Sequence, residues 1–137
     1  MGLHGHCGHL FKGLPARPGL HFDLPLLIRN TSALTGACLL LRRELFWEVG
    51  GFDEDLGVAF QDIDLCLKLH QKGYRNIYTP FAKLKHHESF SKEDSQKVPY
   101  PVEIRRLQEK WKDYMESDPY YNPNLSRKTE HYDLDLG

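Results

Sequence analysis

The chain has 137 residues, with 18 Lys and Arg against 19 Asp and Glu, so its formal net charge is −1. This length suits one domain with a real core and is too short for two ordinary ones. The balanced charge gives no reason to expect a nucleic-acid partner. The longest apolar runs, residues 24–28 and 37–41, fall far short of the roughly 20 residues that cross a bilayer. No transmembrane segment and no secretion signal are predicted, so we expect a cytoplasmic location, with peripheral membrane attachment left open.

Residues 1–30 are rich in Gly, His and Pro, and the three prolines in this stretch prevent a long regular element. They are expected to form an irregular lead-in. A cluster of His4, His6, Cys7 and His9 raises the question of zinc, but no second cluster with structural-site spacing follows it. These histidines are therefore interpreted as loop residues. Cys7, Cys38 and Cys66 are an odd set without paired spacing, and the last two lie in apolar patterns, which predicts reduced, buried thiols.

The segment from Ser32 to Arg42 is nearly continuously apolar, as expected for a strand covered on both faces, and we predict that it is the central strand. Gly36 interrupts it, and a glycine inside a buried strand often marks the close approach of a ligand or another backbone. Residues 43–49 are predicted to form a short helix that ends at Gly50 and Gly51.

The stretch that begins at Gln61 and Asp62 opens a helical apolar pattern that ends at Gly73. Asp62 falls at or near the N-cap, where backbone N–H groups and the helix dipole favour an ionised carboxylate. Such a carboxylate is either a plausible base or only a helix cap. On a regular helix Asp62 and Asp64 would point about 200° apart, so they are expected to do different jobs. Asp64 lies four residues before Lys68, which predicts an ordinary surface ion pair.

Residues 74–79 are predicted to form a short strand, and residues 82–87 another extended piece that ends at His86 and His87. A histidine at the end of a strand is well placed to bind a divalent metal, although such a pair is more often a surface feature. Residues 91–97 have no apolar periodicity and are expected to form a loop. A helix after Pro101 should present one packing stripe, and the tail from Asp118 should wrap the domain or fray. The stripe consists of Ile104, Leu107, Trp111 and Met115.

Six segments in a fixed order resemble glycosyltransferase family 2. They are Thr35-Gly36-Ala37-Cys38-Leu39-Leu40, Gly50-Gly51-Phe52-Asp53-Glu54, Gln61-Asp62-Ile63-Asp64-Leu65-Cys66-Leu67-Lys68, Gly73-Tyr74, Thr79-Pro80 and His86-His87-Glu88-Ser89. The resemblance extends more weakly to Gly8-His9 and to Asp118-Pro119-Tyr120-Tyr121-Asn122-Pro123-Asn124. It implies an α/β fold: a partial GT-A, Rossmann-like domain with a small mixed sheet flanked by helices, an irregular N-terminal lead-in, and a C-terminal helix plus tail. The boundaries are 1–30 for the lead-in, 31–117 for the C-terminal half of the GT-A domain, and 118–137 for the tail.

The resemblance also implies site residues. Asp62 stands where the family has its catalytic base, which would take a proton from an acceptor hydroxyl during inverting transfer from a nucleotide sugar. A divalent cation, Mn²⁺ or Mg²⁺, would neutralise the leaving diphosphate, with His86 as a ligand and Lys92 as a diphosphate contact. Acceptor binding is assigned to Thr35, Gly36, Gly51, Phe52, Asp53 and Asp64.

The chain departs from the family pattern in two ways. Lys92 stands where related sequences usually have an Arg, and a lysine meets a phosphate as a point charge without bidentate geometry. Only 34 residues precede Thr35, where the family's nucleotide-binding half would take about a hundred. The expected partners are therefore a nucleotide-sugar donor, a saccharide acceptor, and either a separate donor-half chain or a second copy of this chain. The isolated chain is expected to be inactive, and the alternative is a non-catalytic module that binds a saccharide or a protein.

Overall fold

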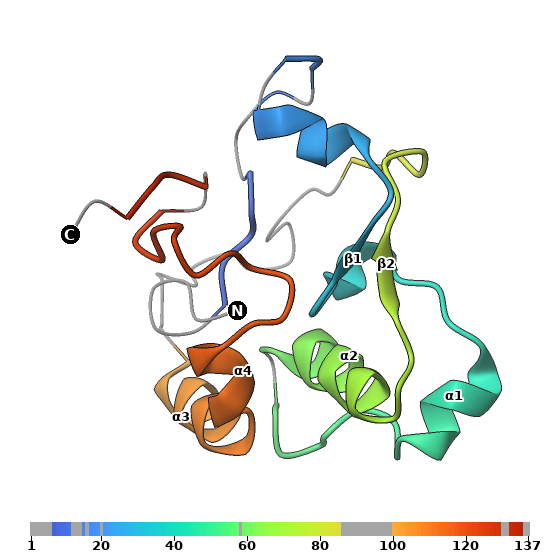
Figure 1. The fold of residues 1–137 in the computed structure, drawn as a ribbon. Helices are drawn as coiled ribbons and strands as arrows, with labels where there is room; N and C mark the ends of the chain where they lie inside the picture. The colour runs from blue at the N-terminus through green and yellow to red at the C-terminus, as the bar shows by residue number, and fades with distance from the viewer. Residues whose placement is uncertain are drawn as a thin grey trace.

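The computed structural model describes residues 7–11, 15, 17–19, 21–57, 59–85, 100–129 and 132–135. Within these ranges the chain forms a small mixed arrangement of four α-helices and a two-stranded sheet (Figure 1). The elements in chain order are η2 (His21–Leu26), β1 (Arg29–Thr31), η3 (Gly36–Cys38), α1 (Arg43–Glu48), α2 (Gln61–Gln71), β2 (Asn76–Tyr78), α3 (Pro101–Lys110) and α4 (Lys112–Glu116). The expected combination of helices with a small sheet is confirmed, but the sheet in the described residues is antiparallel rather than mixed, and the α/β GT-A assignment stays a prediction. No helix in the described ranges is long and apolar enough to cross a bilayer.

The sheet pairs β1 with β2 in antiparallel register, with Asn30 opposite Ile77. The predicted strand over residues 74–79 is thus confirmed in its central part, whereas the predicted central strand over residues 32–42 is wrong. That stretch instead contains the 3-10 turn η3, and Leu40 is 97% exposed. The reason is local hydrogen bonding: side chains of Asp62 and Thr35 accept the backbone N–H groups of residues 36 and 37, which a strand would use for its ladder. This apolar run, which is largely exposed, therefore does not form a strand.

Helix α2 occupies the middle of the molecule, between α1 on one side and the α3–α4 pair on the other (Figure 1). Phe60, in the left-handed conformation at φ 68°, takes the N-cap position without a side-chain cap. Asp62 is therefore the second helical residue, near the N-cap as predicted. At the other end Gly73 has φ 87°, and its N–H and that of Tyr74 donate to the carbonyls of His70 and Leu69. This Schellman arrangement confirms that a glycine ends the helix.

The buried core joins α2 to the last two helices. Leu67 of α2 packs with Leu107, Trp111 and Met115, so the predicted stripe is confirmed for three of its residues, while Ile104 is half-buried. The single helix predicted after Pro101 is divided at Trp111, where φ is −120°, and this break separates α3 from α4. Residues far apart in sequence thereby hold α2 in place from its buried side.

The described part of the tail packs back on the domain rather than fraying. The Tyr121 phenol donates to the Ser126 carbonyl at 2.6 Å, and Arg127 donates to the carbonyls of Met115 and Glu116 at 2.7 Å each. An isolated bridge joins Leu125 to Leu134. These contacts fix the segment that follows α4 against the end of that helix.

None of the three cysteines forms a disulfide, and Cys66 is the one that is buried. Burial raises the pKa of the Cys66 thiol to about 11, despite a backbone hydrogen bond that opposes the shift. Cys38 is exposed, so its predicted burial is wrong, because η3 replaces the expected strand. The Cys66 prediction is confirmed.

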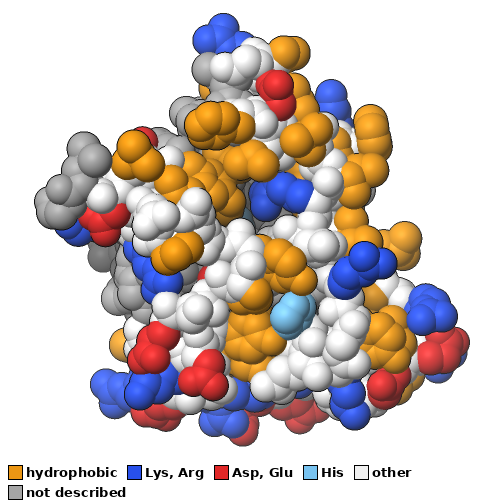
Figure 2. Space-filling view, in the orientation of Figure 1, with side chains coloured by type: hydrophobic (Ala, Val, Ile, Leu, Met, Phe, Trp, Pro, Cys, Tyr) orange, Lys and Arg blue, Asp and Glu red, His pale blue; other side chains and the backbone are white. Residues whose placement is uncertain are grey.

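An exposed apolar surface lies over η2 and along the side of the molecule that carries β1 and β2 (Figure 2). The exposed large side chains on these elements include Phe22 of η2 and Ile77 of β2, and Ile28, which directly precedes β1, is exposed as well. Surfaces of this kind favour association. A separate donor-half chain or a second copy of this chain as the partner stays a prediction.

Candidate functional site

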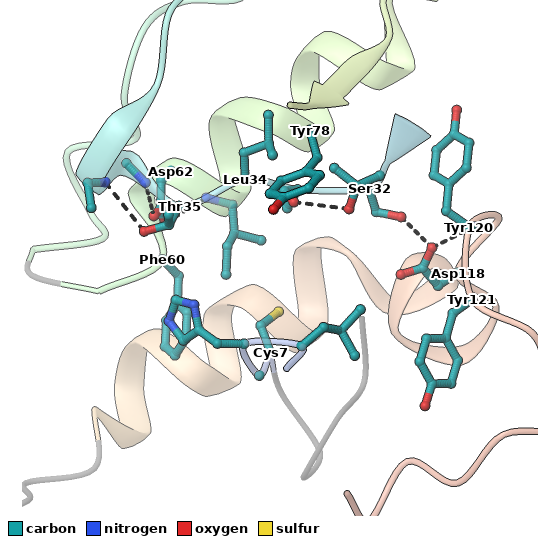
Figure 3. A pocket seen from close by; sticks show the side chains of 18 of the residues that line it. Cys7, Ser32, Leu34, Thr35, Phe60, Asp62, Tyr78, Asp118, Tyr120 and Tyr121 are labelled. Atoms are coloured by element: carbon teal, nitrogen blue, oxygen red, sulfur yellow. Dashed lines mark hydrogen bonds between the residues drawn. The ribbon is translucent and has the colours of Figure 1, made fainter. Parts of the chain in front are cut away.

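A cleft of about 750 Å³ opens where six parts of the chain meet. They are residues 7–10, the stretch from β1 to Ala37, Phe52, the start of α2, the end of β2 at Tyr78, and the segment that follows α4. Figure 3 shows Asp62 and Thr35 at one end of this cleft, Tyr120 and Tyr121 at the other, and Tyr78 between them. A volume of this size accommodates a small organic ligand.

Asp62 lines the cleft with its carboxylate held at both oxygens. Oδ2 accepts the backbone N–H of Gly36 at 2.6 Å, and Oδ1 accepts that of Ile63 at 2.9 Å. Each carboxylate oxygen can accept about two hydrogen bonds, so each retains capacity for a further donor. The side chain is half-buried at the cleft wall. The Asp62 carboxylate is therefore held in place and can still accept a hydrogen bond from a hydroxyl group of a ligand.

Gly36 allows this arrangement because it has no side chain. A Cβ at this position would lie 3.2 Å from the Asp62 Cβ and 3.4 Å from its Oδ2. The close approach expected for this glycine is thus made by the aspartate side chain. Thr35 lies beside it, and its Oγ1 accepts the Ala37 N–H at 3.3 Å to cap η3. Both residues line the cleft together with Asp62.

The remaining residues assigned to acceptor binding divide into two groups. Phe52 lines the cleft, whereas Gly51 and Asp53 do not belong to its lining. Gly51, at φ 66°, is buried against the Phe46 ring. Asp53 accepts from Lys110 at 2.8 Å, and this hydrogen bond is the main reason that the pKa of its carboxyl lies below its usual range. The structure therefore places Gly51 against α1 and ties Asp53 to α3, and both lie outside the cleft lining.

Asp64 is not the surface residue that its spacing to Lys68 predicts, because its side chain is 0% exposed. The pair with Lys68 exists at 3.0 Å, but Asp64 also meets Lys110 Nζ at 2.7 Å and accepts from Trp111 Nε1 at 2.9 Å. Two of these three partners belong to the segment that carries α3, which lies far from Asp64 in the sequence. Asp64 therefore joins α2 to α3 and lies outside the cleft lining.

Tyrosines form a wall of the cleft that sequence reasoning did not assign to the site. Tyr78, Tyr120, Tyr121 and Tyr132 all line it. Tyr121 and Tyr132 stack with centroids 5.3 Å apart, and the Tyr120 phenol lies 3.2 Å from His70 Nε2. The sequence feature that could have indicated this wall is the Asp118-Pro119-Tyr120-Tyr121 run, which belongs to the weaker part of the family resemblance but was assigned no function.

Asp118 anchors this tyrosine wall to the end of β1. Its Oδ1 accepts a short hydrogen bond from the Ser32 hydroxyl and a 2.9 Å bond from the Tyr120 N–H (Figure 3). Ser32 is itself held, because the buried Asn76 donates to its carbonyl and to that of Cys66, at 2.9 Å each. These hydrogen bonds connect the segment after α4, the end of β1 and α2 on the sides of one cleft.

His86 and Lys92, the predicted metal ligand and diphosphate contact, lie outside the described residues, as does His87. Among the residues that the structure describes, no group of three His, Cys, Asp or Glu side chains is arranged to hold a metal ion. The described residues therefore do not by themselves form the expected cation site.

Comparison with known proteins identifies relatives in polysaccharide biosynthesis. The chain is 44% identical to an uncharacterized protein of Sinorhizobium fredii over 131 residues, covering 92% of this chain and 14% of the relative. It is 36% identical over 135 residues to the O-antigen biosynthesis protein RfbC of Myxococcus xanthus, covering 92% of this chain and 10% of that protein. It is also 43% identical over 63 residues to an N-acetylglucosaminyl-diphospho-decaprenol L-rhamnosyltransferase of Mycobacterium tuberculosis, covering 46% of this chain and 20% of the enzyme.

The chain thus spans no more than a fifth of the length of these curated relatives. No family model matches it, and no solved structure matches it. The chain is homologous over a limited segment to a glycosyltransferase and to an O-antigen biosynthesis protein, which supports a relation to sugar transfer. The activities named for the relatives belong to those longer proteins.

Proposed function

We propose that this chain forms the acceptor-side part of an inverting, metal-dependent glycosyltransferase that moves a sugar from a nucleotide-sugar donor to a saccharide hydroxyl. The observation that carries the proposal is the Asp62 carboxylate, fixed at the cleft wall by the N–H groups of Gly36 and Ile63. The partial homology to an L-rhamnosyltransferase supports it.

In this proposal Asp62 acts as a general base. One of its oxygens accepts the proton of the acceptor hydroxyl while that hydroxyl oxygen forms a bond to the anomeric carbon of the donor sugar. The bond between that carbon and the nucleoside diphosphate breaks, and the configuration at the carbon inverts. Because both carboxylate oxygens are already held by backbone donors, Asp62 is positioned before the acceptor arrives.

The tyrosine wall would hold the acceptor. Aromatic rings offer apolar faces for the C–H surface of a sugar ring, and their phenols offer hydrogen bonds at the rim. Tyr120 is well suited because its phenol is tied to His70, which also contacts the Tyr114 phenol at 2.6 Å. A tethered ring loses less freedom when a ligand binds.

A Mn²⁺ or Mg²⁺ ion with His86 as a ligand, and Lys92 at the diphosphate, remain part of the proposal for the complete enzyme. A divalent cation would neutralise charge on the leaving diphosphate. The proposed roles of Asp62 and of the tyrosines do not depend on this ion.

The second candidate is a saccharide-binding module without catalysis. The same tyrosine wall favours it, because an aromatic cleft can bind a sugar whether or not a base is present. The two candidates differ in what Asp62 does after binding.

A chimera separates them. The Myxococcus relative matches this chain over 135 residues, so the chain can replace that segment of the longer protein. The chimera is incubated with nucleotide sugars and oligosaccharide acceptors, and the release of nucleoside diphosphate is measured. Acceptor-dependent release supports the enzyme. Saccharide binding to the 137-residue chain by NMR, with no release by a folded chimera, supports the binding module.

A further inference from the structure

Among the described residues, Arg29 is the arginine of the cleft lining, and the residue is half-buried. It lies opposite Tyr78 in the sheet register, and its Cζ lies 5.1 Å from the centre of the Tyr78 ring. The Tyr78 phenol donates to the Pro25 carbonyl at 2.9 Å, so the ring beneath the guanidinium is held in place. The cation is therefore fixed at the cleft wall by stacking.

This cation lacks an anionic partner among the described residues. Its Nε is buried and has no hydrogen-bond acceptor there, and the ion pairs that the described residues form do not include it. The carboxylates in the cleft lining are Asp62 and Asp118, which receive hydrogen bonds from other groups. A guanidinium carries five N–H donors, and leaving a buried donor unpaired is costly.

The charge of Arg29 also acts on Tyr132, another residue of the cleft lining. Burial raises the pKa of the Tyr132 phenol, and Arg29 is the charge that opposes this shift, so the guanidinium lies near that phenol as well. Tyr132 stacks on Tyr121 at an interplanar angle of 20°. Arg29, Tyr78 and Tyr132 all line this cleft, and the Tyr78 ring lies beside the guanidinium.

We propose that Arg29 forms an anion subsite in this cleft, which binds a phosphate or carboxylate group carried by the saccharide acceptor. This inference rests on the proposed function and adds the chemical class of its acceptor. Planar guanidinium groups bind such oxyanions through two parallel hydrogen bonds. The subsite lies toward Tyr78, in the middle of the cleft, whereas Asp62 lies at one end (Figure 3). An acceptor would place its charged group at Arg29 and its reacting hydroxyl at Asp62.

NMR titration of the 137-residue chain tests this without any substitution. The probes are N-acetylglucosamine, N-acetylglucosamine 1-phosphate, glucuronate, inorganic phosphate and uridine diphosphate. The anionic sugars are expected to bind about tenfold more tightly than the neutral sugar, as for a charge-assisted hydrogen bond. The comparison of the sugar phosphate with glucuronate identifies which anion the subsite prefers.

Variants then locate the effect. Arg29→Gln should abolish the preference for the anionic sugars, and Arg29→Lys should retain part of it, because a lysine keeps the charge without the planar pair of donors. Arg75→Gln is the matched control, since Arg75 is exposed, precedes β2 and lies outside the cleft lining. It should leave the preference unchanged. Circular dichroism establishes that each variant is folded.

The outcomes separate this inference from the proposed function. Equal binding of neutral and anionic sugars by the unsubstituted chain overturns the subsite and leaves the proposed function standing. Arg29-dependent binding of inorganic phosphate and sugar phosphates, with no binding of the neutral sugar and no transfer by the chimera, supports the subsite and removes the proposed function. Arg29-dependent binding confined to uridine diphosphate overturns the assignment to the acceptor.

Discussion

Replacing Asp64 with Asn should destabilise the fold far more than its spacing to Lys68 suggests. The buried carboxylate contacts Lys110 at 2.7 Å and Lys68 at 3.0 Å, and it accepts from the Trp111 indole at 2.9 Å. Asparagine can keep the indole hydrogen bond through its carbonyl oxygen. It removes the negative charge between the two ammonium groups, and with it the electrostatic link between α2 and α3.

The loss of stability expected for Asp64→Asn depends on how exposed to solvent the two lysine side chains are. Removing one partner of a fully buried ion pair costs about 3–5 kcal/mol. The side chains of Lys68 and Lys110 are 18% and 36% exposed, so solvent can take up part of the uncompensated charge. We therefore expect a loss of about 2–3 kcal/mol in the free energy of unfolding, which lowers the melting temperature by roughly 6–12 °C.

Thermal and urea unfolding followed by circular dichroism measure this loss on the 137-residue chain. Asp113→Asn, on the exposed surface of α4, is the matched control and should stay within about 0.5 kcal/mol of the unsubstituted chain. Asp62→Asn should lose about 1 kcal/mol, because one of its two backbone hydrogen bonds is lost. If Asp64→Asn proved as mild as Asp113→Asn, the structural role of Asp64 would be refuted.

Three further predictions concern the cleft and its surroundings. Gly36→Ala should weaken saccharide binding severalfold in an NMR titration, because its methyl group would press on Asp62 at 3.2 Å; unchanged affinity would argue against the close contact. Cys66 should resist iodoacetamide at pH 8 while the exposed Cys38 reacts, as mass spectrometry of the native chain can show; rapid labelling of Cys66 would contradict its burial and its pKa of about 11. Folding lowers the pKa of Asp53, so the ionised carboxylate stabilises the fold at pH values above its unfolded-state pKa, and this contribution is lost as the pH falls through its folded-state pKa. Asp53→Asn should therefore reduce the loss of stability on acidification below pH 4. An unaltered dependence of stability on acid pH would refute this.

The parts of the fold that sequence predicts well are those with strong local signals. The α2 helix has helical apolar spacing and a glycine at its end, and both features were confirmed. The packing stripe of the last two helices follows from the same periodicity. The predicted strand over residues 32–42 was wrong because two side-chain acceptors take up backbone donors that a sheet would need, and an apolar run by itself does not reveal such contacts.

The candidate site was predictable only in part for a similar reason. Asp62, Thr35, Gly36 and Phe52 were named from their resemblance to a known motif, and the structure brings them to one cleft. The tyrosine wall and Arg29 come from segments that meet only in the folded chain, so no local pattern reveals them. The prediction that Asp64 is a surface residue was wrong because two of its partners, Lys110 and Trp111, lie at the end of α3, and the helical spacing around Asp64 cannot reveal contacts so distant in sequence.

Sugar transfer by the chimera with the Myxococcus relative, compared between Asp62 and its Asn variant, tests the central claim most directly. Asparagine keeps the size of the side chain and one of its backbone contacts, but it cannot accept the proton of the acceptor hydroxyl. The account predicts that kcat falls by roughly 10²–10⁴-fold while the chimera stays folded and acceptor binding changes little. The Asp113→Asn variant of the same chimera should retain full transfer. Near-normal transfer by the Asp62→Asn chimera would contradict the assignment of Asp62 as the base.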